Sequence, residues 1–260
     1  MSEEVLVDAQ DGVLVITLNR PAARNAVNLA VSEAVAAAMT ELDSSPDLSV
    51  GVLTGAGATF CAGMDLKAFL RGESPVIPGR GFLGLVEAPP EKPLIAAVEG
   101  YALAGGCEAV LAADLVVASR TAKFGIPEVK RGLAAAAGGL MRLPRRIPPA
   151  VALELALTGD LFDAERAFAL GLVNRLADEG QALDVALDLA RSIAANGPLA
   201  VRASKRSSAR AWSGRRTRCS SGNVRSPVRY SPPPMRRKAP GPSRRSDRLA
   251  GVGSRARQPG

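Results

Sequence analysis

Two acidic side chains stand in surroundings that suit acid–base chemistry. Glu108 is the only charged residue in the stretch 101–113, YALAGGCEAVLAA, whose remaining composition suits a buried helix. Glu128 follows a proline in FGIPEVKRG, and that proline prevents a helix from running through the position. Two carboxyl groups in a dry pocket have raised pKa values, so that one of them can hold a proton. The plainer alternatives are a solvent-exposed carboxylate for Glu108 and an ion pair with Lys130 or Arg131 for Glu128.

Small residues form two turns that can present backbone donors. Residues 104–106, AGG, come at a predicted helix start, where N–H groups have no partner within the helix. Residues 61–65, CAGMD, also precede a predicted helix. Two such turns can direct N–H groups at one carbonyl oxygen and so form an oxyanion hole. Ordinary close packing of small residues is the alternative.

The composition excludes several other kinds of catalyst. The chain contains no histidine, which removes Ser-His-Asp and Cys-His nucleophiles and His-ligated zinc. Its three cysteines, Cys61, Cys107 and Cys219, form no CxxC metal site, and we interpret the first two as buried packing residues. Residues 79–84, GRGFLG, match the spacing GxGxxG but follow a proline-broken loop, so we expect no dinucleotide site. Catalysis is left to carboxylates and backbone amides.

Strands that alternate with helices must position these groups. Two short strands, 5–7 and 13–18, are joined at Asp11-Gly12, a pair typical of a hairpin turn. Apolar residues at near-helical spacing predict a helix over 29–44, with Asn28 as its N-cap. Similar patterns predict buried strands at 49–53, 93–98 and 115–118, and helices at 103–113, 150–157, 164–170 and 182–195. This order favours parallel pairing in a layered α/β fold.

The charge of the chain changes abruptly near residue 207. Residues 1–206 hold 19 Lys and Arg against 24 Asp and Glu, a net −5, whereas residues 207–260 hold 14 against one, a net +13. The second segment also has 10 Ser and 7 Pro in 54 residues and no apolar periodicity. Such a segment cannot bury enough surface to offset its ordering entropy. We therefore expect one domain over 1–206 and a disordered or out-of-frame tail over 207–260.

The sequence gives no sign of a membrane or secretory protein. No uncharged run reaches the roughly 18 residues that a membrane span needs. The acidic start, MSEEVLVDAQ, lacks the basic and then apolar layout of a signal peptide. We expect a cytoplasmic protein without a membrane partner.

These motifs resemble the enoyl-CoA hydratase/isomerase family, also called the crotonase superfamily. The resemblance covers residues 5–206 in family order and spacing, through LNRPAARNAV (18–27), FCAGMDLKAF (60–69), KPLIAAVEGYALAGGCEAVLAADLVVAS (92–119), AKFGIPEVKRGL (122–133), GGLMRLPRRI (138–147) and TGDLFDAERAFALGLVNRL (158–176). It implies a crotonase-like, ββα-type layered core. The family's turn after GL contains a Pro-Gly pair, which this chain replaces with four alanines, 134–137, at the wall of the acyl pocket. The chain-length preference therefore stays open.

The resemblance also implies roles for particular residues. Glu108 and Glu128 match the family's two hydratase glutamates, and the amides of Met64 and Gly105 match its oxyanion hole. The residues that match coenzyme A contacts are Ala62, Asp65 and Leu66 in one turn and, more weakly, the phosphate-contacting positions Arg24 and Lys67.

These roles imply a reaction, the hydration of 2-trans-enoyl-CoA to 3-hydroxyacyl-CoA, as in fatty acid β-oxidation. The thioester oxygen is bound in the oxyanion hole, and water between the glutamates adds at the β-carbon. Coenzyme A belongs to the substrate, and no metal or redox cofactor is required. The alternative is an enoyl-CoA isomerase of the same family, which keeps the position of Glu128 and does not need Glu108. The presence of both glutamates favours hydration.

The resemblance ends after Pro198–Arg206, where relatives continue into helices that cover the acyl site and make trimer contacts. The family thus implies a homotrimer or hexamer, which the tail of this chain puts in doubt. We favour a reading-frame shift for 207–260, because Arg, Ser, Pro, Gly and Ala are what a GC-rich gene gives out of frame. A solvated extension and a nucleic-acid-binding arm are the alternatives. The latter is disfavoured because only Trp212 and Tyr230 can stack on bases. A frame shift would leave a CoA-ester-binding protein with impaired catalysis.

Overall fold

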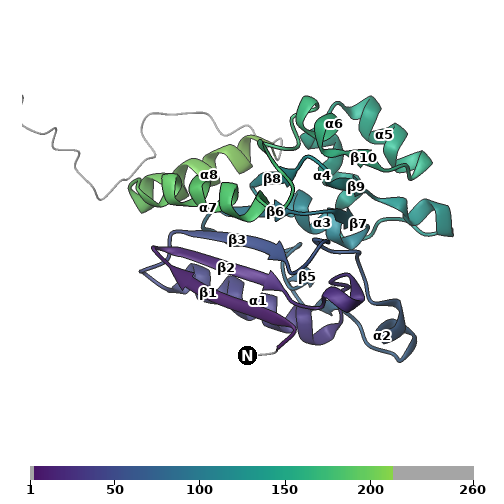
Figure 1. Ribbon diagram of the computed structural model, residues 1–260, viewed down its shortest axis with the longest axis horizontal. Helices are drawn as coiled ribbons and strands as arrows, with labels where there is room; N and C mark the ends of the chain where they lie inside the picture. The colour runs from purple at the N-terminus through teal and green to yellow at the C-terminus, as the bar shows by residue number, and fades with distance from the viewer. Residues whose placement is uncertain (1–2, 213–260) are drawn as a thin grey trace, which may run out of the picture. The chain divides into compact units, whose positions relative to one another are not determined.

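A six-stranded sheet with helices on both faces forms the centre of the computed structural model, which describes residues 3–212 (Figure 1). The strands are, in spatial order, β1 (Val5–Gln10), β2 (Val13–Leu18), β3 (Val50–Gly55), β6 (Leu94–Val98), β8 (Leu115–Ser119) and β11 (Arg175–Ala177). Strand β1 runs antiparallel to β2, and the other neighbours pair in parallel. The parallel pairing expected from the sequence is confirmed.

The hairpin between β1 and β2 forms where the sequence predicts it. Asp11 and Gly12 have φ angles of 53° and 77°, as a type I′ turn requires. Strands β3 and β6 are buried along almost their whole length, because helices cover both faces of the sheet.

Two helices pack on opposite faces of this sheet. Helix α1 (Leu29–Ser44) begins at Asn28, whose side chain accepts a hydrogen bond from the Val31 amide, as expected for an N-cap. Helix α7 (Ala182–Ala194) packs against β3, β6 and β8. Its buried face carries alanines at every fourth position, 182, 186 and 190, which let the helix approach the strands closely.

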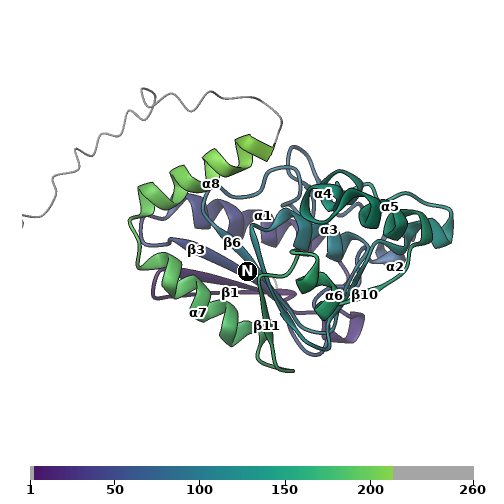
Figure 2. The same cartoon turned by 90° about the horizontal axis from the view of Figure 1, so that it is seen from above.

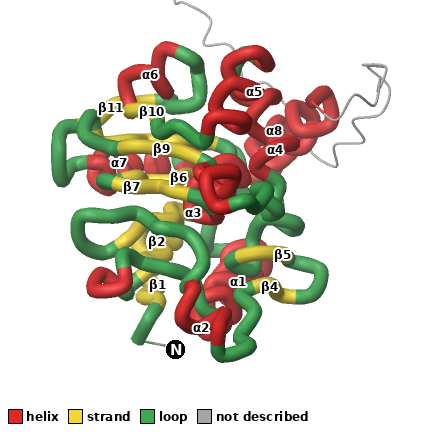
Figure 3. The backbone as a smooth tube through the Cα atoms, turned by 90° about the vertical axis from the view of Figure 1, so that its right-hand side faces the viewer, coloured by secondary structure: helices red, strands yellow, loops and turns green. Residues whose placement is uncertain are grey.

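A second, three-stranded sheet lies beside α3 (Gly105–Ala112) and consists of β10 (Phe162–Asp163), β9 (Lys123–Gly125) and β7 (Tyr101–Leu103) (Figure 3). Strand β7 corrects the sequence prediction of one helix over 103–113. Residues 101–103 pair in parallel with β9, so the helix begins only at Gly105.

Further helices, two 3-10 turns and a two-stranded ribbon lie outside these two sheets. The helices α2 (Leu66–Leu70), α4 (Gly139–Arg146), α5 (Pro149–Thr158) and α6 (Ala164–Ala169) lie away from α7, at the other end of the sheet (Figure 2). The two 3-10 turns are η1 (Pro21–Ala23) and η2 (Pro127–Arg131). Strands β4 (Val76–Ile77) and β5 (Gly81–Phe82) form a two-stranded ribbon. The GxGxxG segment thus forms part of a hairpin and not the strand-to-helix turn of a dinucleotide site.

Helix α8 (Pro198–Trp212) continues six residues past the expected domain boundary at 206. Lys205 anchors it, because its Nζ donates to the carbonyl oxygens of Pro90 at 2.7 Å and Lys92 at 2.9 Å and to Asp114 Oδ2 at 2.6 Å. The rest of the predicted tail, 213–260, lies outside the described residues. Between residues 3 and 212, none of the helices has the length and apolar character needed to cross a membrane.

Candidate active site

Glu108 lies in the first turn of α3 and is only 2% exposed, so the solvent-exposed alternative is wrong. Its Oε1 accepts hydrogen bonds from the backbone N–H groups of Ala137 and Gly139, both at 2.8 Å. A Cβ atom at Gly139 would lie 2.9 Å from Glu108 Cγ, so glycine is what lets this amide come so close. Burial raises the pKa of Glu108 and the charge of Glu128 adds to the rise, although the two amides oppose it.

Glu128 lies in η2, directly after Pro127, and is half-buried. Lys130 does not pair with it, because Lys130 Nζ binds Asp160 Oδ1 at 2.7 Å. The Oε2 atom of Glu128 is buried and has no hydrogen-bond partner among the described residues. Burial raises the pKa of this carboxyl, whereas a hydrogen bond from its own backbone N–H and the charge of Arg131 oppose the rise. A buried carboxyl oxygen without a partner is costly, and such groups concentrate at functional sites.

The two small-residue turns lie against each other. The N–H of Cys61 donates to the Tyr101 carbonyl and the N–H of Leu103 donates to the Cys61 carbonyl, each at 3.0 Å, which makes a parallel bridge. Just beyond this bridge, a Cβ atom at Gly63 would lie 3.3 Å from the backbone nitrogen of Gly105. The chain thus brings the second turn to the start of α3.

Both candidate oxyanion donors have uncommitted amides. Val27 N–H donates to the Gly63 carbonyl at 2.8 Å, and Asp65 N–H donates to the Val27 carbonyl at 2.9 Å. This bridge uses the residues on either side of Met64 and leaves the N–H of Met64 itself unused. Within residues 3–212, neither the Met64 nor the Gly105 amide has a hydrogen-bond acceptor. Such donors can bind an oxygen atom of a ligand.

The backbone is strained where α3 begins. Ala104, at the N-cap, has φ 49° and ψ −126°, a conformation that L-residues rarely adopt. Strain of this kind costs on the order of 1–3 kcal/mol and is concentrated at functional sites. Gly106, two residues on, has no room for a side chain, because a Cβ atom there would lie 2.3 Å from the Cys61 carbonyl oxygen. Both features bring the N-terminus of α3 close to the turn 61–65.

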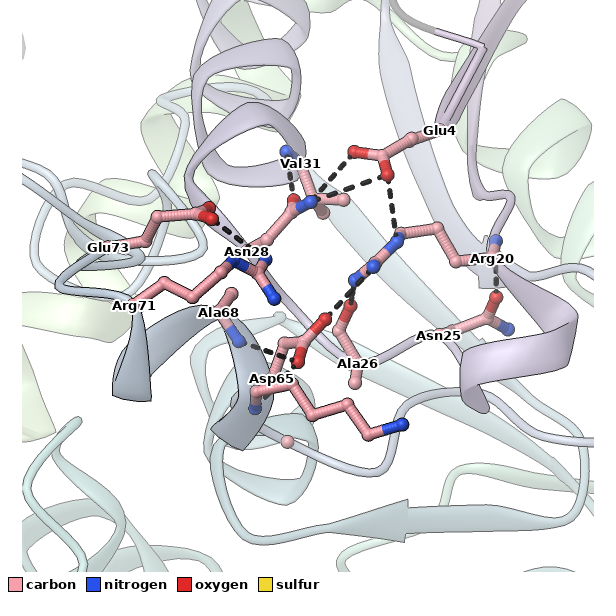
Figure 4. Close-up of polar contacts among 12 residues, drawn as sticks. Glu4, Arg20, Asn25, Ala26, Asn28, Val31, Asp65, Ala68, Arg71 and Glu73 are labelled. Atoms are coloured by element: carbon pink, nitrogen blue, oxygen red, sulfur yellow. Dashed lines mark hydrogen bonds and ion pairs between the residues drawn. The ribbon is translucent and has the colours of Figure 1, made fainter.

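An ion-pair network holds the start of α2 (Figure 4). Arg20 lies between two carboxylates, with Nε 3.0 Å from Glu4 Oε1 and Nη2 2.9 Å from Asp65 Oδ2. The other carboxyl oxygen of Asp65 caps α2 by accepting the amides of Lys67 at 3.0 Å and Ala68 at 3.1 Å. Burial works to raise the pKa of Asp65, but the bonds from Ala68 and Arg20 outweigh it and lower the pKa.

The expected coenzyme A contacts gather around this same turn. Ala62 N–H donates to the Arg24 carbonyl at 3.0 Å, which joins the two parts of the chain that carry these residues. Arg24, Leu66 and Lys67 are exposed at this edge. Their roles in binding coenzyme A stay predictions.

Residues 8–230 match the family model described as enoyl-CoA hydratase/isomerase. The chain belongs to the enoyl-CoA hydratase/isomerase family. The match begins three residues into β1 and ends beyond the last described residue.

Members of the enoyl-CoA hydratase/isomerase family with high similarity include both hydratases and dehydratases. Enoyl-CoA hydratase EchA19 of Mycobacterium tuberculosis is 44% identical over 215 residues, which cover 78% of this chain and 79% of the relative. Carnitinyl-CoA dehydratase of Salmonella agona is 42% identical over 79% of this chain and 80% of the relative. The solved structure of enoyl-CoA hydratase EchA1 from Mycobacterium marinum is 65% identical with a TM-score of 0.79, over 81% of this chain and 84% of that one. The predicted family and crotonase-like fold are thereby confirmed.

In this member of the enoyl-CoA hydratase/isomerase family, an apolar cavity of about 540 Å³ adjoins η2, the segment that carries Glu128. Ile126 and Val129, which flank Glu128 in the chain, contribute to its wall, as do Ala134 and Ala135 of the alanine run. The other lining residues are apolar as well: Leu133, Leu140, Leu143, Pro144, Pro149, Ala152, Leu153, Ala156 and Leu157.

Sequence reasoning missed the groups that hold Glu108. The amides of Ala137 and Gly139 bind its carboxylate, and Arg142 in turn binds the Ala137 carbonyl at 3.2 Å. Backbone donors carry no residue-type signal, so only the GG pair at 138–139 within the GGLMRLPRRI motif pointed to this turn. Arg20 had no signal beyond its place in the LNRP motif.

Proposed function

We propose that this chain catalyses the reversible hydration of 2-trans-enoyl-CoA thioesters to 3-hydroxyacyl-CoA. The observation that carries the proposal is the pair of carboxyls formed by buried Glu108 and half-buried Glu128. Each has a raised pKa, and they lie close enough for the charge of Glu128 to act on Glu108. A carboxyl whose pKa lies nearer neutrality exchanges protons with a substrate more effectively.

The thioester oxygen accepts hydrogen bonds from the amides of Met64 and Gly105. These bonds stabilise the negative charge that develops on this oxygen when the β-carbon is attacked. Loss of one such donor typically costs about 3 kcal/mol of transition-state stabilisation. Support comes from the absence of an acceptor for either amide between residues 3 and 212.

The two carboxyls divide the proton transfers. Glu108 acts as the base, because two amide bonds to its Oε1 favour its charged form. It takes a proton from water while the water oxygen bonds to the β-carbon. Glu128, whose Oε2 is buried without a donor among the described residues, supplies the proton that the α-carbon receives. Glu108 then releases its proton to solvent and Glu128 takes one up, so that both carboxyls return to their starting protonation states and one water molecule is added overall.

The acyl group is an uncharged hydrocarbon chain. The cavity beside the Glu128 segment is lined by apolar side chains, so a charge or a hydroxyl group on the acyl chain beyond the β-carbon would lose hydration there without gaining a polar partner. Crotonyl-CoA and a longer straight-chain 2-enoyl-CoA are therefore the substrates of choice for an assay.

The proposal is tested by Glu108→Gln and Glu128→Gln. Each variant keeps the shape of the side chain but cannot transfer a proton, so we expect kcat for hydration to fall by about 100-fold or more. The dissociation constant for crotonyl-CoA, measured by calorimetry, should change little. Near-normal turnover in either variant would refute the paired-carboxylate mechanism. If only Glu108→Gln keeps activity, and that activity moves a double bond of 3-enoyl-CoA, the chain is an isomerase.

A further inference from the structure

The Arg142 side chain connects two segments that both pack against α3. It is half-buried on α4, and its guanidinium donates through Nη1 to the Ala137 carbonyl at 3.2 Å and through Nη2 to the Val86 carbonyl. Both segments contact α3, because α4 packs against it and the Phe82 ring of β5, four residues before Val86, lies against Gly105. A guanidinium can bridge two such acceptors because its donors are fixed in one plane.

One end of this bridge orders the turn that binds Glu108. A Cβ atom at Gly138 would lie 2.1 Å from Arg142 Nη1, so the guanidinium lies directly over this residue, whose φ is +95°. The backbone N–H of Arg142 also donates to the Gly138 carbonyl, at 3.0 Å. Ala137 therefore has its carbonyl held by Arg142 while its amide holds Glu108 Oε1.

The other end reaches the segment that packs on Gly105. Val86 N–H donates to the Phe82 carbonyl at 3.3 Å, which joins the two residues in one turn. The Phe82 ring lies over Gly105, because a Cβ atom there would be 2.6 Å from two of its ring carbons. The Val86 carbonyl that Arg142 binds is therefore one turn away from Phe82, whose ring packs on the proposed oxyanion donor Gly105.

We propose that Arg142 is a positioning residue that ties the turn anchoring Glu108 to the segment packed on Gly105, so that base and oxyanion hole keep one spacing. This inference rests on the proposed hydratase function. Arg142 acts through Glu108 and Gly105 and takes no part in the proton transfers itself.

Arg142 also acts electrostatically on Glu108. The charged groups that act on Glu108 are Glu128 from η2 and Arg142 from α4. The Cys107 thiol of α3 lies near it, and burial together with the charge of Glu108 raises the pKa of that thiol. Of the two charged groups, only the guanidinium favours the Glu108 carboxylate, so it lowers the pKa that burial and Glu128 raise. Removal of the cation therefore moves the acidic limb of the kcat/KM profile to higher pH, because Glu108 must be ionised to act as base.

The test compares Arg142→Lys and Arg142→Met with Arg145→Met, a matched change of an exposed arginine on the same helix. We expect Arg142→Met to lower kcat by about 10- to 100-fold, the effect of a small misplacement of reacting groups, and to shift the acidic limb upward. Arg142→Lys keeps the charge but cannot bridge two carbonyls, so kcat should fall while the limb stays in place. KM should change by less than about 3-fold in both, because Arg142 lies away from the expected coenzyme A turn. Arg145→Met should behave as the unchanged chain.

A readout that needs no turnover separates this inference from the proposed function. The Glu108 carboxyl can be titrated by carbon-13 NMR and assigned by its loss in Glu108→Gln. A rise of the Glu108 titration midpoint in Arg142→Met would support the coupling of Arg142 to Glu108 even if the unchanged chain showed no hydration. Absent hydration in the unchanged chain would overturn the hydratase proposal alone. An unchanged midpoint and an unchanged kcat in Arg142→Met would overturn the inference. If Arg142→Met does not fold, Arg142→Lys alone decides the question. A kcat in Arg142→Lys equal to that of the unchanged chain would overturn the inference, and a lowered kcat would support it.

Discussion

Because Gly139 has no side chain, its backbone N–H can come close enough to bind the Glu108 carboxylate. Because a Cβ atom there would lie 2.9 Å from Glu108 Cγ and 3.0 Å from Oε1, Gly139→Ala must push the carboxylate away from the amides that bind it. We expect kcat for crotonyl-CoA hydration to fall by about 10-fold or more, and the free energy of unfolding to fall by about 1–3 kcal/mol through overpacking. Steady-state kinetics and urea denaturation measure the two effects.

Gly197→Ala is the matched control at this scale. Nothing lies within 4 Å of a Cβ atom at Gly197, and its φ lies outside the left-handed region. Its activity and stability should match those of the unchanged chain. If Gly139→Ala behaves like this control, Glu108 does not depend on the close approach of that amide.

At the scale of elements, Asp65 both caps α2 and receives the Arg20 ion pair. Asp65→Ala removes both interactions, and we expect it to lower the free energy of unfolding by about 2 kcal/mol and to raise KM for crotonyl-CoA. Asp65→Asn keeps a good capping oxygen and loses the charge, so its effects should be about half as large. Thermal unfolding and steady-state kinetics measure both quantities.

Asp163→Ala provides the comparison, because Asp163 caps α6 through the Arg166 amide at 2.8 Å and lies outside the expected coenzyme A turn. It should lower stability by about 1 kcal/mol and leave KM unchanged. Equal KM values in Asp65→Ala and Asp163→Ala would contradict a role for the α2 turn in substrate binding.

The elements were predictable from sequence where the signal is local. The helix over 29–44 and its Asn28 cap follow from spacing and residue type, and the structure confirms them. Residues 101–103 defeated this reasoning because pairing with β9, distant in the chain, overrides their helical pattern. Glu108 and Glu128 stood out as charges in unusual surroundings, whereas the backbone donors that hold Glu108 depend on tertiary contacts alone.

At the scale of the whole molecule, Lys205 fastens α8 to the rest of the described residues. Its three acceptors lie in the loop before β6 and at the start of β8, and its side chain is 17% exposed. Lys205→Met keeps most of the apolar stem and removes three charge-assisted bonds, so we expect a loss of about 2–3 kcal/mol in the free energy of unfolding. Urea denaturation of the full chain measures it.

Arg191→Met supplies the reference for this change. Arg191 is on α7 and makes an exposed pair with Asp188 at 3.0 Å, which contributes at most about 0.5 kcal/mol. A loss in Lys205→Met no larger than that of Arg191→Met would mean that α8 is not held by this lysine.

The loop that contains the four alanines, 134–137, makes two kinds of contact, one through side chains and one through the backbone. The methyl groups of Ala134 and Ala135 line the apolar cavity, whereas the backbone N–H groups of Ala137 and Gly139 bind the Glu108 carboxylate. Side chains in the first half of this loop can therefore be exchanged without altering the anchor. We expect substitutions at Ala134 and Ala135 to change which acyl chains the cavity accepts and to leave the proposed proton transfers unchanged.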